Sequence, residues 1–259
     1  NYLSAASFVG IYLVSHNIGY QFQELSYFNN TRKSAKSLCD KYQDLFGNKL
    51  ATDSIFDQSV FPIQLEQVSV EKDGETILAP CDLTIHAGEK IAIIGESGAG
   101  KTTLLNILYG EIHPSQGQIR YQGRELTSCQ LYQAGAYILQ SSHVFDDLSV
   151  EENIALGQEI DQQRMDNILQ ETGILSLKGK VPSNQTLSGG EKQRLEIARA
   201  LYHKRQFILA DEVKANLDAK NQEKINQLLF SLPQAVVEVI HHYTKEDLKR
   251  YDKVIHLKK

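Results

Sequence analysis

The chain has 259 residues, a formal net charge of −5 and a pI near 5.9. This length suits one large α/β domain with an appendage, and the acidic balance, without a long basic run, argues against nucleic-acid binding through a general electrostatic patch. Cys39, Cys81 and Cys129 are scattered, in no metal or redox spacing, which indicates incidental thiols in a reducing compartment.

The first segment is the most apolar part of the chain. Residues 5–14 (AASFVGIYLV) form a nearly unbroken apolar run, about half of the roughly 20 residues that cross a bilayer. Ile18, Phe22 and Leu25 continue it at helical spacing. We expect residues 1–46 to be the end of a transmembrane helix with a cytoplasmic extension, and residues 47–60 to be a linker. The alternative is an amphipathic helix that packs on a soluble domain or is disordered.

Strands and helices alternate from residue 61 onward, which predicts an α/β fold with a mostly parallel sheet covered on both faces. Short strands near residues 63–70, 77–78 and 82–86 predict an antiparallel section before it. Further strands are expected at 90–95, 136–140, 206–212, 235–240 and 253–257, with helices at 102–108, after Ser188 and from 219 to 231.

A glycine-rich loop follows the isoleucine-rich strand at 90–95 and leads into a helix, which is the context that a P-loop requires. Glycines allow successive backbone N–H groups to turn towards phosphate oxygens, and the helix N-terminus adds positive charge. Lys101 would contact the β- and γ-phosphates and the Thr102 hydroxyl would bind magnesium. The predicted nucleotide-binding residues are Gly95, Glu96, Ser97, Gly98, Ala99, Gly100, Lys101, Thr102 and Thr103.

Two carboxylates end the apolar strand at 206–212 (QFILADE). Asp211 at a strand end can hold magnesium through water, and Glu212 can polarise an attacking water. Two acids after a strand can also be ordinary loop residues, but their presence after a P-loop favours the catalytic interpretation.

A second anion site is predicted 87 residues after Lys101, where Ser188, Gly189, Gly190 and Glu191 precede a helix. Ser followed three residues later by Glu is a capping box, and a capped helix start with two glycines binds anions. Since the P-loop already serves the chain's own nucleotide, this site is expected to serve another one.

About residues 61–259 resemble the nucleotide-binding domain of the ABC transporter family. The resemblance rests on three motifs in this order: the P-loop, Leu187–Ser188–Gly189–Gly190–Glu191, and the strand ending Asp211–Glu212. The resemblance implies a P-loop NTPase core, an antiparallel β subdomain and a helical subdomain at about 141–200. It implies ATP and Mg²⁺ as ligands, with Lys101 and Glu212 as catalytic residues. It also implies a second such domain paired head to tail, so that Ser188, Gly189 and Gly190 of one chain cover the ATP of the other.

The same resemblance implies further roles. Gln140, which ends the strand at 136–140, would contact magnesium and relay the nucleotide state to membrane helices. His242 would bind the γ-phosphate and orient the water; His241, at a position where the family usually has threonine, leaves some ambiguity between the two. Asn216, Leu217 and Asp218 resemble the loop that crosses the dimer interface, and residues 145–154 resemble a stretch of exporters.

The chain also departs from the family pattern. Lys72 stands where a tyrosine often stacks on adenine, and Pro182 stands where exporters commonly have a glutamate. Glu212 is followed by Val213–Lys214–Ala215–Asn216 in place of Pro-Thr-Ser-Ala, and the helix start continues Glu191–Lys192–Gln193–Arg194, a form more frequent in importers. Because of the apolar run at 5–14 and the exporter-like residues 145–154, we nevertheless expect the ATPase domain of an exporter at the cytoplasmic side of the cell membrane. The alternatives are a non-transport ABC ATPase and a regulatory module that senses ATP.

Overall fold

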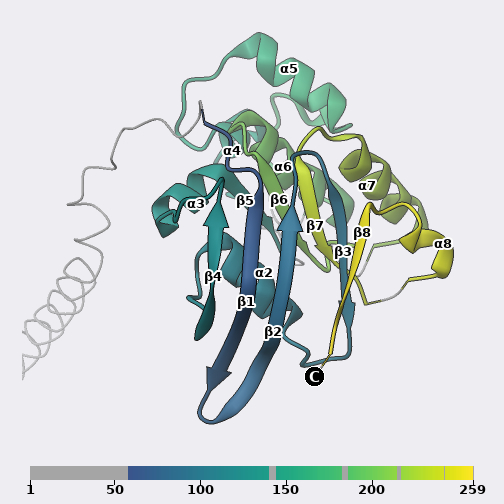
Figure 1. Ribbon diagram of the computed structural model, residues 1–259. Helices are drawn as coiled ribbons and strands as arrows, with labels where there is room; N and C mark the ends of the chain where they lie inside the picture. Colours follow the sequence, from purple (N-terminus) through teal and green to yellow (C-terminus); the bar gives the residue numbers. More distant parts are fainter. Residues whose placement is uncertain (1–57, 140–143, 183–185, 215–216, 242, 259) are drawn as a thin grey trace, which may run out of the picture. The chain divides into compact units, whose positions relative to one another are not determined.

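The computed structural model describes residues 58–139, 144–182, 186–214, 217–241 and 243–258 (Figure 1). The predictions for residues 1–46, Gln140, Asn216 and His242 lie outside these ranges. Among the helices in these ranges, none combines the length and the apolar character needed to cross a membrane.

A three-stranded antiparallel sheet comes first, in the order β2-β1-β4. Its strands are β1 (Ile63–Lys72), β2 (Glu75–Ile85) and β4 (Gln116–Tyr121). The prediction of two short strands at 77–78 and 82–86 is wrong, because both belong to β2, and β4 was not predicted. Pro80 lies within β2, but β2 is an edge strand, where a missing N–H is tolerated, and pairing continues past it from Val70↔Leu78 to Val68↔Cys81.

The second sheet has five parallel strands in the order β5-β6-β7-β3-β8. They are β5 (Gly135–Ile138), β6 (Phe207–Asp211), β7 (Ala235–Val239), β3 (Lys90–Gly95) and β8 (Lys253–Leu257). Their near-continuous apolar runs are typical of strands covered on both faces. Because the strands are parallel, the residues that follow Gly95, Ile138, Asp211 and Val239 meet at one edge, where ligands bind in such sheets.

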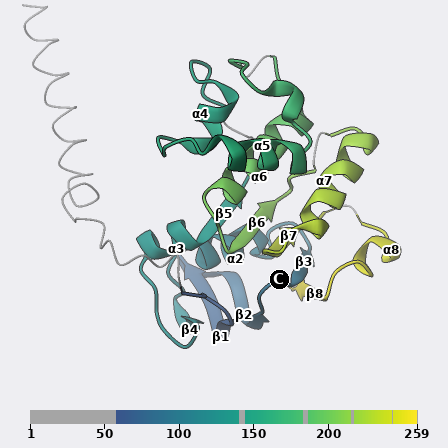
Figure 2. The same ribbon diagram turned by 90° about the horizontal axis from the view of Figure 1, so that it is seen from above.

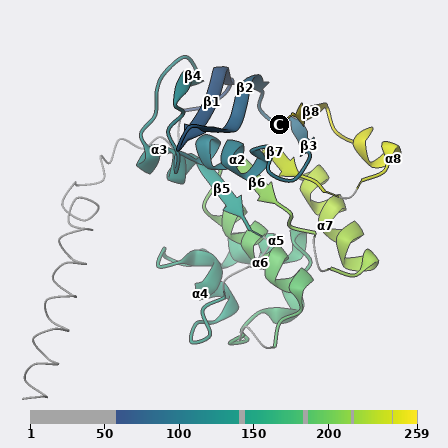
Figure 3. The same ribbon diagram turned by 90° about the horizontal axis from the view of Figure 1, so that it is seen from below.

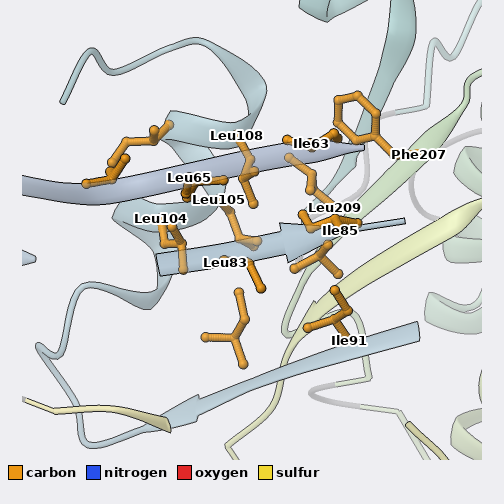
Figure 4. Packing of buried hydrophobic residues seen from close by; sticks show 14 of the residues in the cluster. Ile63, Leu65, Leu83, Ile85, Ile91, Leu104, Leu105, Leu108, Phe207 and Leu209 are labelled. Carbon is orange, nitrogen blue, oxygen red and sulfur yellow. The ribbon is translucent and has the colours of Figure 1, made fainter. Parts of the chain in front are cut away.

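One face of the five-stranded sheet packs against helix α2 (Lys101–Tyr109) and the antiparallel sheet. Leu104, Leu105 and Leu108 of α2 lie among side chains of β1, β2 and β6 in a single buried cluster (Figure 4). Two shorter helices, α3 (Ser128–Ala134) and α8 (Lys245–Leu248), lie near the two ends of the strand order. This packing fixes the start of α2 next to the carboxyl ends of β3 and β6.

The opposite face of this sheet packs against α6 (Gly189–Tyr202) and α7 (Ala219–Ser231), with Ile208 and Val236 contributed by the strands. A separate apolar cluster joins α6 to α4 (Val150–Ala155), α5 (Gln162–Glu171) and the short helix η2 (Leu175–Leu177). Figures 2 and 3 show α4, α5 and α6 on the side of the five-stranded sheet away from β1, β2 and β4. The predicted fold class is confirmed: a parallel core, an antiparallel section and a helical section.

Candidate functional site

The loop between β3 and α2 has the backbone that a phosphate cradle needs. Gly98 and Gly100 have φ values of 80° and 82°, in the left-handed region, which glycine adopts without steric cost. Gly100 is the residue before the first turn of α2, and a Cβ there would lie 2.5 Å from the carbonyl oxygen of Ile77. The loop is thus both curved and pressed against β2, while Ser97 and Gly98 stay exposed.

Lys101 lies along this loop. Its Nζ donates hydrogen bonds to the carbonyl oxygens of Gly95 at 2.9 Å and Glu96 at 2.8 Å, and the residue is only 5% exposed. The ammonium is therefore held over the loop by two neutral acceptors. An anionic phosphate oxygen is a stronger acceptor than a carbonyl, so a bound phosphate can replace either contact.

Thr102 and Asp211 come together as the sequence predicts for two groups that share a magnesium ion. The Thr102 hydroxyl donates to Asp211 Oδ2 at 2.9 Å. The Tyr137 hydroxyl donates to the same oxygen at 3.4 Å, and burial, together with the Asp211 charge, raises the pKa of this phenol. The other carboxylate oxygen, Asp211 Oδ1, is buried and has no hydrogen-bond partner in the described part of the chain. A hydroxyl and a carboxylate with a spare acceptor are hard oxygen ligands, which fit Mg²⁺ and its bound water.

Glu212 has a strained backbone and a histidine partner. Its φ of 51° lies in the left-handed region, which is rare outside glycine and clusters at functional sites. Its Oε1 lies 2.7 Å from Nε2 of His241, and both side chains are about one third exposed. His242, the residue predicted to orient the water, lies outside the described residues. Two adjacent histidines are the only signal in the sequence for this Glu212–His241 pair.

Ser188 begins helix α6 with a complete capping box, as predicted. Glu191 N donates to Ser188 Oγ at 3.3 Å and Ser188 N donates to Glu191 Oε2 at 2.9 Å. The hydrogen bond from the Ser188 hydroxyl lowers the pKa of Glu191. A Cβ on Gly189 would lie 2.9 Å from Leu217, and one on Gly190 would lie 3.0 Å from Asn221. The glycines thus let α6 pack closely on the start of α7.

Helix α6 also connects the predicted anion site to two other segments. Gln193 Nε2 donates to the carbonyl oxygen of Leu139 at 3.1 Å, one residue before Gln140. Arg199 Nε donates to the carbonyl oxygen of Asn153 at 2.7 Å. The fully buried Asn153 side chain in turn bonds Phe145, Leu148 and Ser149. Asn153 therefore holds residues 145–149 to helix α4, a structural role that the sequence pattern of residues 145–154 does not indicate.

The structure therefore gathers Lys101, Thr102, Asp211 and Glu212 at one edge of the parallel sheet, at the ends of β3 and β6. Ser188 belongs to a separate helix start, where its hydrogen bonds stay within its own cap. Lys72, at the position where the family often has tyrosine, is exposed at the end of β1. A strand, a phosphate loop with its lysine, and a second strand of the same parallel sheet that leads into two carboxylates define a P-loop nucleotide-binding ATPase.

The sequence model of the ABC transporter family matches residues 78–215. The chain is 36% identical over 176 residues to the lipoprotein-releasing system ATP-binding protein LolD of Idiomarina loihiensis, covering 62% of this chain and 76% of that protein. It is 33% identical over 209 residues to the putative 2-aminoethylphosphonate import ATP-binding protein PhnT of Salmonella typhimurium, covering 76% of this chain. The chain belongs to the ABC transporter family, and it is the ATP-binding domain of a transporter, with ATPase activity.

Similarity to a solved structure agrees with this assignment. A bacterial Atm1-family ABC exporter with ATP bound superposes with a TM-score of 0.66 at 25% identity, over 76% of this chain and 38% of the exporter. The chain spans 56% of the length of PhnT. The similarity therefore concerns the ATPase domain. The substrates for which the relatives are named are not assigned to this chain.

Proposed function

We propose that the chain hydrolyses Mg²⁺-ATP with Glu212 as the base that polarises the attacking water. One observation carries this proposal. The Thr102 hydroxyl contacts the Asp211 carboxylate at 2.9 Å, and Glu212, the next residue in the chain, is thereby placed beside the phosphate loop. A bound Mg²⁺ supplies charge neutralisation to the β- and γ-phosphates. Thr102, Asp211 and Gln140 are the residues that we assign to its binding.

In the proposed reaction, the N–H groups of residues 95–103 and the Lys101 ammonium bind the phosphate oxygens and stabilise the charge that develops as the γ-phosphoryl group leaves. Glu212 accepts a hydrogen bond from water and directs it in line with the phosphorus. We assign the γ-phosphate contact to His242. Oε1 of Glu212 lies 2.7 Å from Nε2 of His241, and we assign the contact with this water to the second carboxylate oxygen.

The partner that we propose is a second ABC ATPase domain, from an identical or a related chain, arranged head to tail. The cap of α6 supports this arrangement, because Ser188, Gly189 and Gly190 present a helix N-terminus whose side-chain hydrogen bonds stay within its own cap. Such a start attracts a phosphate. ATP bound by the P-loop of one chain would then join it to Ser188–Gly190 of the other, and hydrolysis would weaken the pair.

We further propose that this cycle drives export across the cell membrane, with the ATPase domain on the cytoplasmic side and transmembrane helices of the same transporter as partners. Residues 145–154, similar to exporters and organised by the buried Asn153, support this direction, as does the apolar run at 5–14. Import is the second candidate, since PhnT is named for import and Glu191–Lys192–Gln193–Arg194 is a form more frequent in importers. Alkaline extraction of native membranes separates the two. A protein that stays in the membrane supports a fused exporter, and a protein that is released supports a separate importer-type subunit.

Glu212→Gln tests the central assignment. The amide keeps the size of the side chain and removes its basicity, so we expect ATP to bind with unchanged affinity while turnover falls roughly 10²- to 10⁴-fold. Glu171→Gln, at the exposed end of α5, is the control and should keep wild-type turnover. If Glu212→Gln keeps wild-type turnover, Glu212 is not the base.

A further inference from the structure

Lys214 is a charged residue close to Glu212 that has no role in the proposed reaction. It lies two residues after Glu212, in the segment where this chain departs from the family pattern. Its ammonium lies 2.7 Å from Oε1 of Glu238 and donates to Oδ1 of Asn226, also at 2.7 Å. Lys214 therefore joins the segment after β6 to strand β7 and to helix α7.

Glu238 is an unusual residue for its position. It lies in the middle of the sheet on β7, only 1% exposed, and its register partners on β6 and β3 are Ala210 and Ala92. A cavity of about 480 Å³ lies beside this part of the sheet, and Lys214 and Glu238 line it together with Glu212 and His241. The Tyr251 hydroxyl donates to the second oxygen of Glu238. Oε2 thus accepts a hydrogen bond, while the charge on Oε1 is balanced by the ion pair with Lys214 and not by a hydrogen bond.

A buried ion pair is weak evidence for stability, because apolar residues of the same volume often stabilise a core at least as well. Stability alone therefore does not account for the Lys214–Glu238 ion pair. We ask instead which nearby residue it holds in place. The candidate is the backbone of Glu212, since a strained left-handed residue persists only where its neighbours hold it on both sides. On one side, Asp211 pairs with Val239 in the sheet and accepts the Thr102 hydroxyl.

On the other side of Glu212, Val213 is 2% exposed in the core, and Lys214 follows with its ion pair. The Lys214 carbonyl oxygen also accepts from Leu217 N and from Gln222 Nε2, each at 3.3 Å. Side chain and main chain of Lys214 are therefore both fixed. A shift of Lys214 would be transmitted to Glu212 through one intervening residue.

We propose that Lys214, through its ion pair with Glu238, is a positioning residue that holds Glu212 in the geometry required to activate water. This inference rests on the proposed role of Glu212. It predicts that loss of the ion pair lowers kcat without lowering the affinity for ATP, because the P-loop contacts of Lys101 and Thr102 do not involve Lys214.

The test uses the full chain with Lys214→Met, which keeps the length of the side chain and removes its charge. We expect kcat to fall roughly 10- to 100-fold, the size of effect that a misplacement of about 1 Å produces, with an unchanged Kd for ATP. Lys214→Arg keeps a cation beside Glu238 and should recover part of the lost kcat. Lys253→Met is the matched control, because it breaks another ion pair of 2.7 Å, with Glu89, at the start of β8; its kcat should equal that of the wild type.

The double variant Lys214→Met/Glu238→Gln separates positioning from stability. It removes both charges while the amide can still accept from Tyr251, so the thermal midpoint should return towards the wild-type value while kcat stays low. Recovery of kcat together with the midpoint would overturn the positioning role. If Glu212→Gln abolishes turnover and both Lys214 variants keep it, only this inference fails; if Glu212→Gln keeps turnover, the proposed function itself fails.

Discussion

Replacing Gly100 by alanine tests how tightly the phosphate loop is built into the fold, with Gly98→Ala as the matched control. The two glycines have nearly the same φ, 82° and 80°. They differ in their surroundings. A Cβ on Gly100 would lie 2.5 Å from Ile77 O and 3.0 Å from Leu78 Cδ1, whereas a Cβ on Gly98 would have no heavy atom within 4 Å.

The backbone conformation costs both variants about 1–2 kcal/mol of stability, the usual penalty for a left-handed residue with a Cβ. Only Gly100→Ala adds the cost of overpacking, about 1–3 kcal/mol, because the closest atom belongs to the β2 backbone and cannot rotate away. The expected losses are thus about 1–2 kcal/mol for Gly98→Ala and roughly 2–5 kcal/mol for Gly100→Ala.

Thermal unfolding without nucleotide, followed by circular dichroism, measures this difference. At about 2–4 °C per kcal/mol for a domain of this size, Gly100→Ala should unfold roughly 2–12 °C below Gly98→Ala. Urea unfolding should give the same order with equal m-values. Equal midpoints for the two variants would refute the argument that β2 confines the loop at Gly100.

Two further outcomes follow from described contacts. Ser188→Ala should lower the free energy of unfolding by about 1 kcal/mol at pH 7 through loss of the α6 cap. The Ser188 hydroxyl holds the pKa of Glu191 below its unfolded value of 4.5, so the stability that this pair contributes is present above pH 4.5 and is lost as pH falls through the folded pKa. Urea unfolding should therefore show a smaller difference in unfolding free energy between wild type and Ser188→Ala in acid than at pH 7. The same difference at both pH values would contradict the assignment. Burial, with a smaller effect of Asp82, raises the pKa of the Cys81 thiol to about 11. In a Cys39→Ser/Cys129→Ser background, iodoacetamide should therefore modify Cys81 slowly at pH 8 and much faster in urea; equal rates would contradict the raised pKa and partial burial of this thiol.

The parallel sheet and the P-loop could be predicted because their signals are local. Apolar runs of five or six residues mark β3, β6 and β7, and β3 and β6 end in a glycine and an acidic residue. The spacing of Gly98, Gly100 and Lys101 is set by one loop. The cap of α6 was readable for the same reason, since Ser188 and Glu191 belong to one turn. The antiparallel sheet was harder, because β4 pairs with β1 across more than 40 residues, from Ser69 to Gln116.

The contacts between distant segments could not be predicted from spacing. Lys214 was noted only as a departure from the family pattern, and Glu238 was read as one residue of a strand. Their 2.7 Å contact depends on the register that places Glu238 between Ala210 and Ala92. The contact of His241 with Glu212 likewise depends on how the segment after β7 turns, which two adjacent histidines do not specify.

The mass of the Glu212→Gln protein in solution, with and without Mg²⁺-ATP, tests the account most directly. Binding without hydrolysis should leave ATP between the P-loop of one chain and Ser188–Gly190 of another, so we predict a monomer that becomes a dimer only with the nucleotide. Ser188→Arg in the same background should bind ATP and remain a monomer, because its side chain fills the second anion site. A Glu212→Gln protein that binds ATP and stays monomeric would contradict the head-to-tail pair of identical chains.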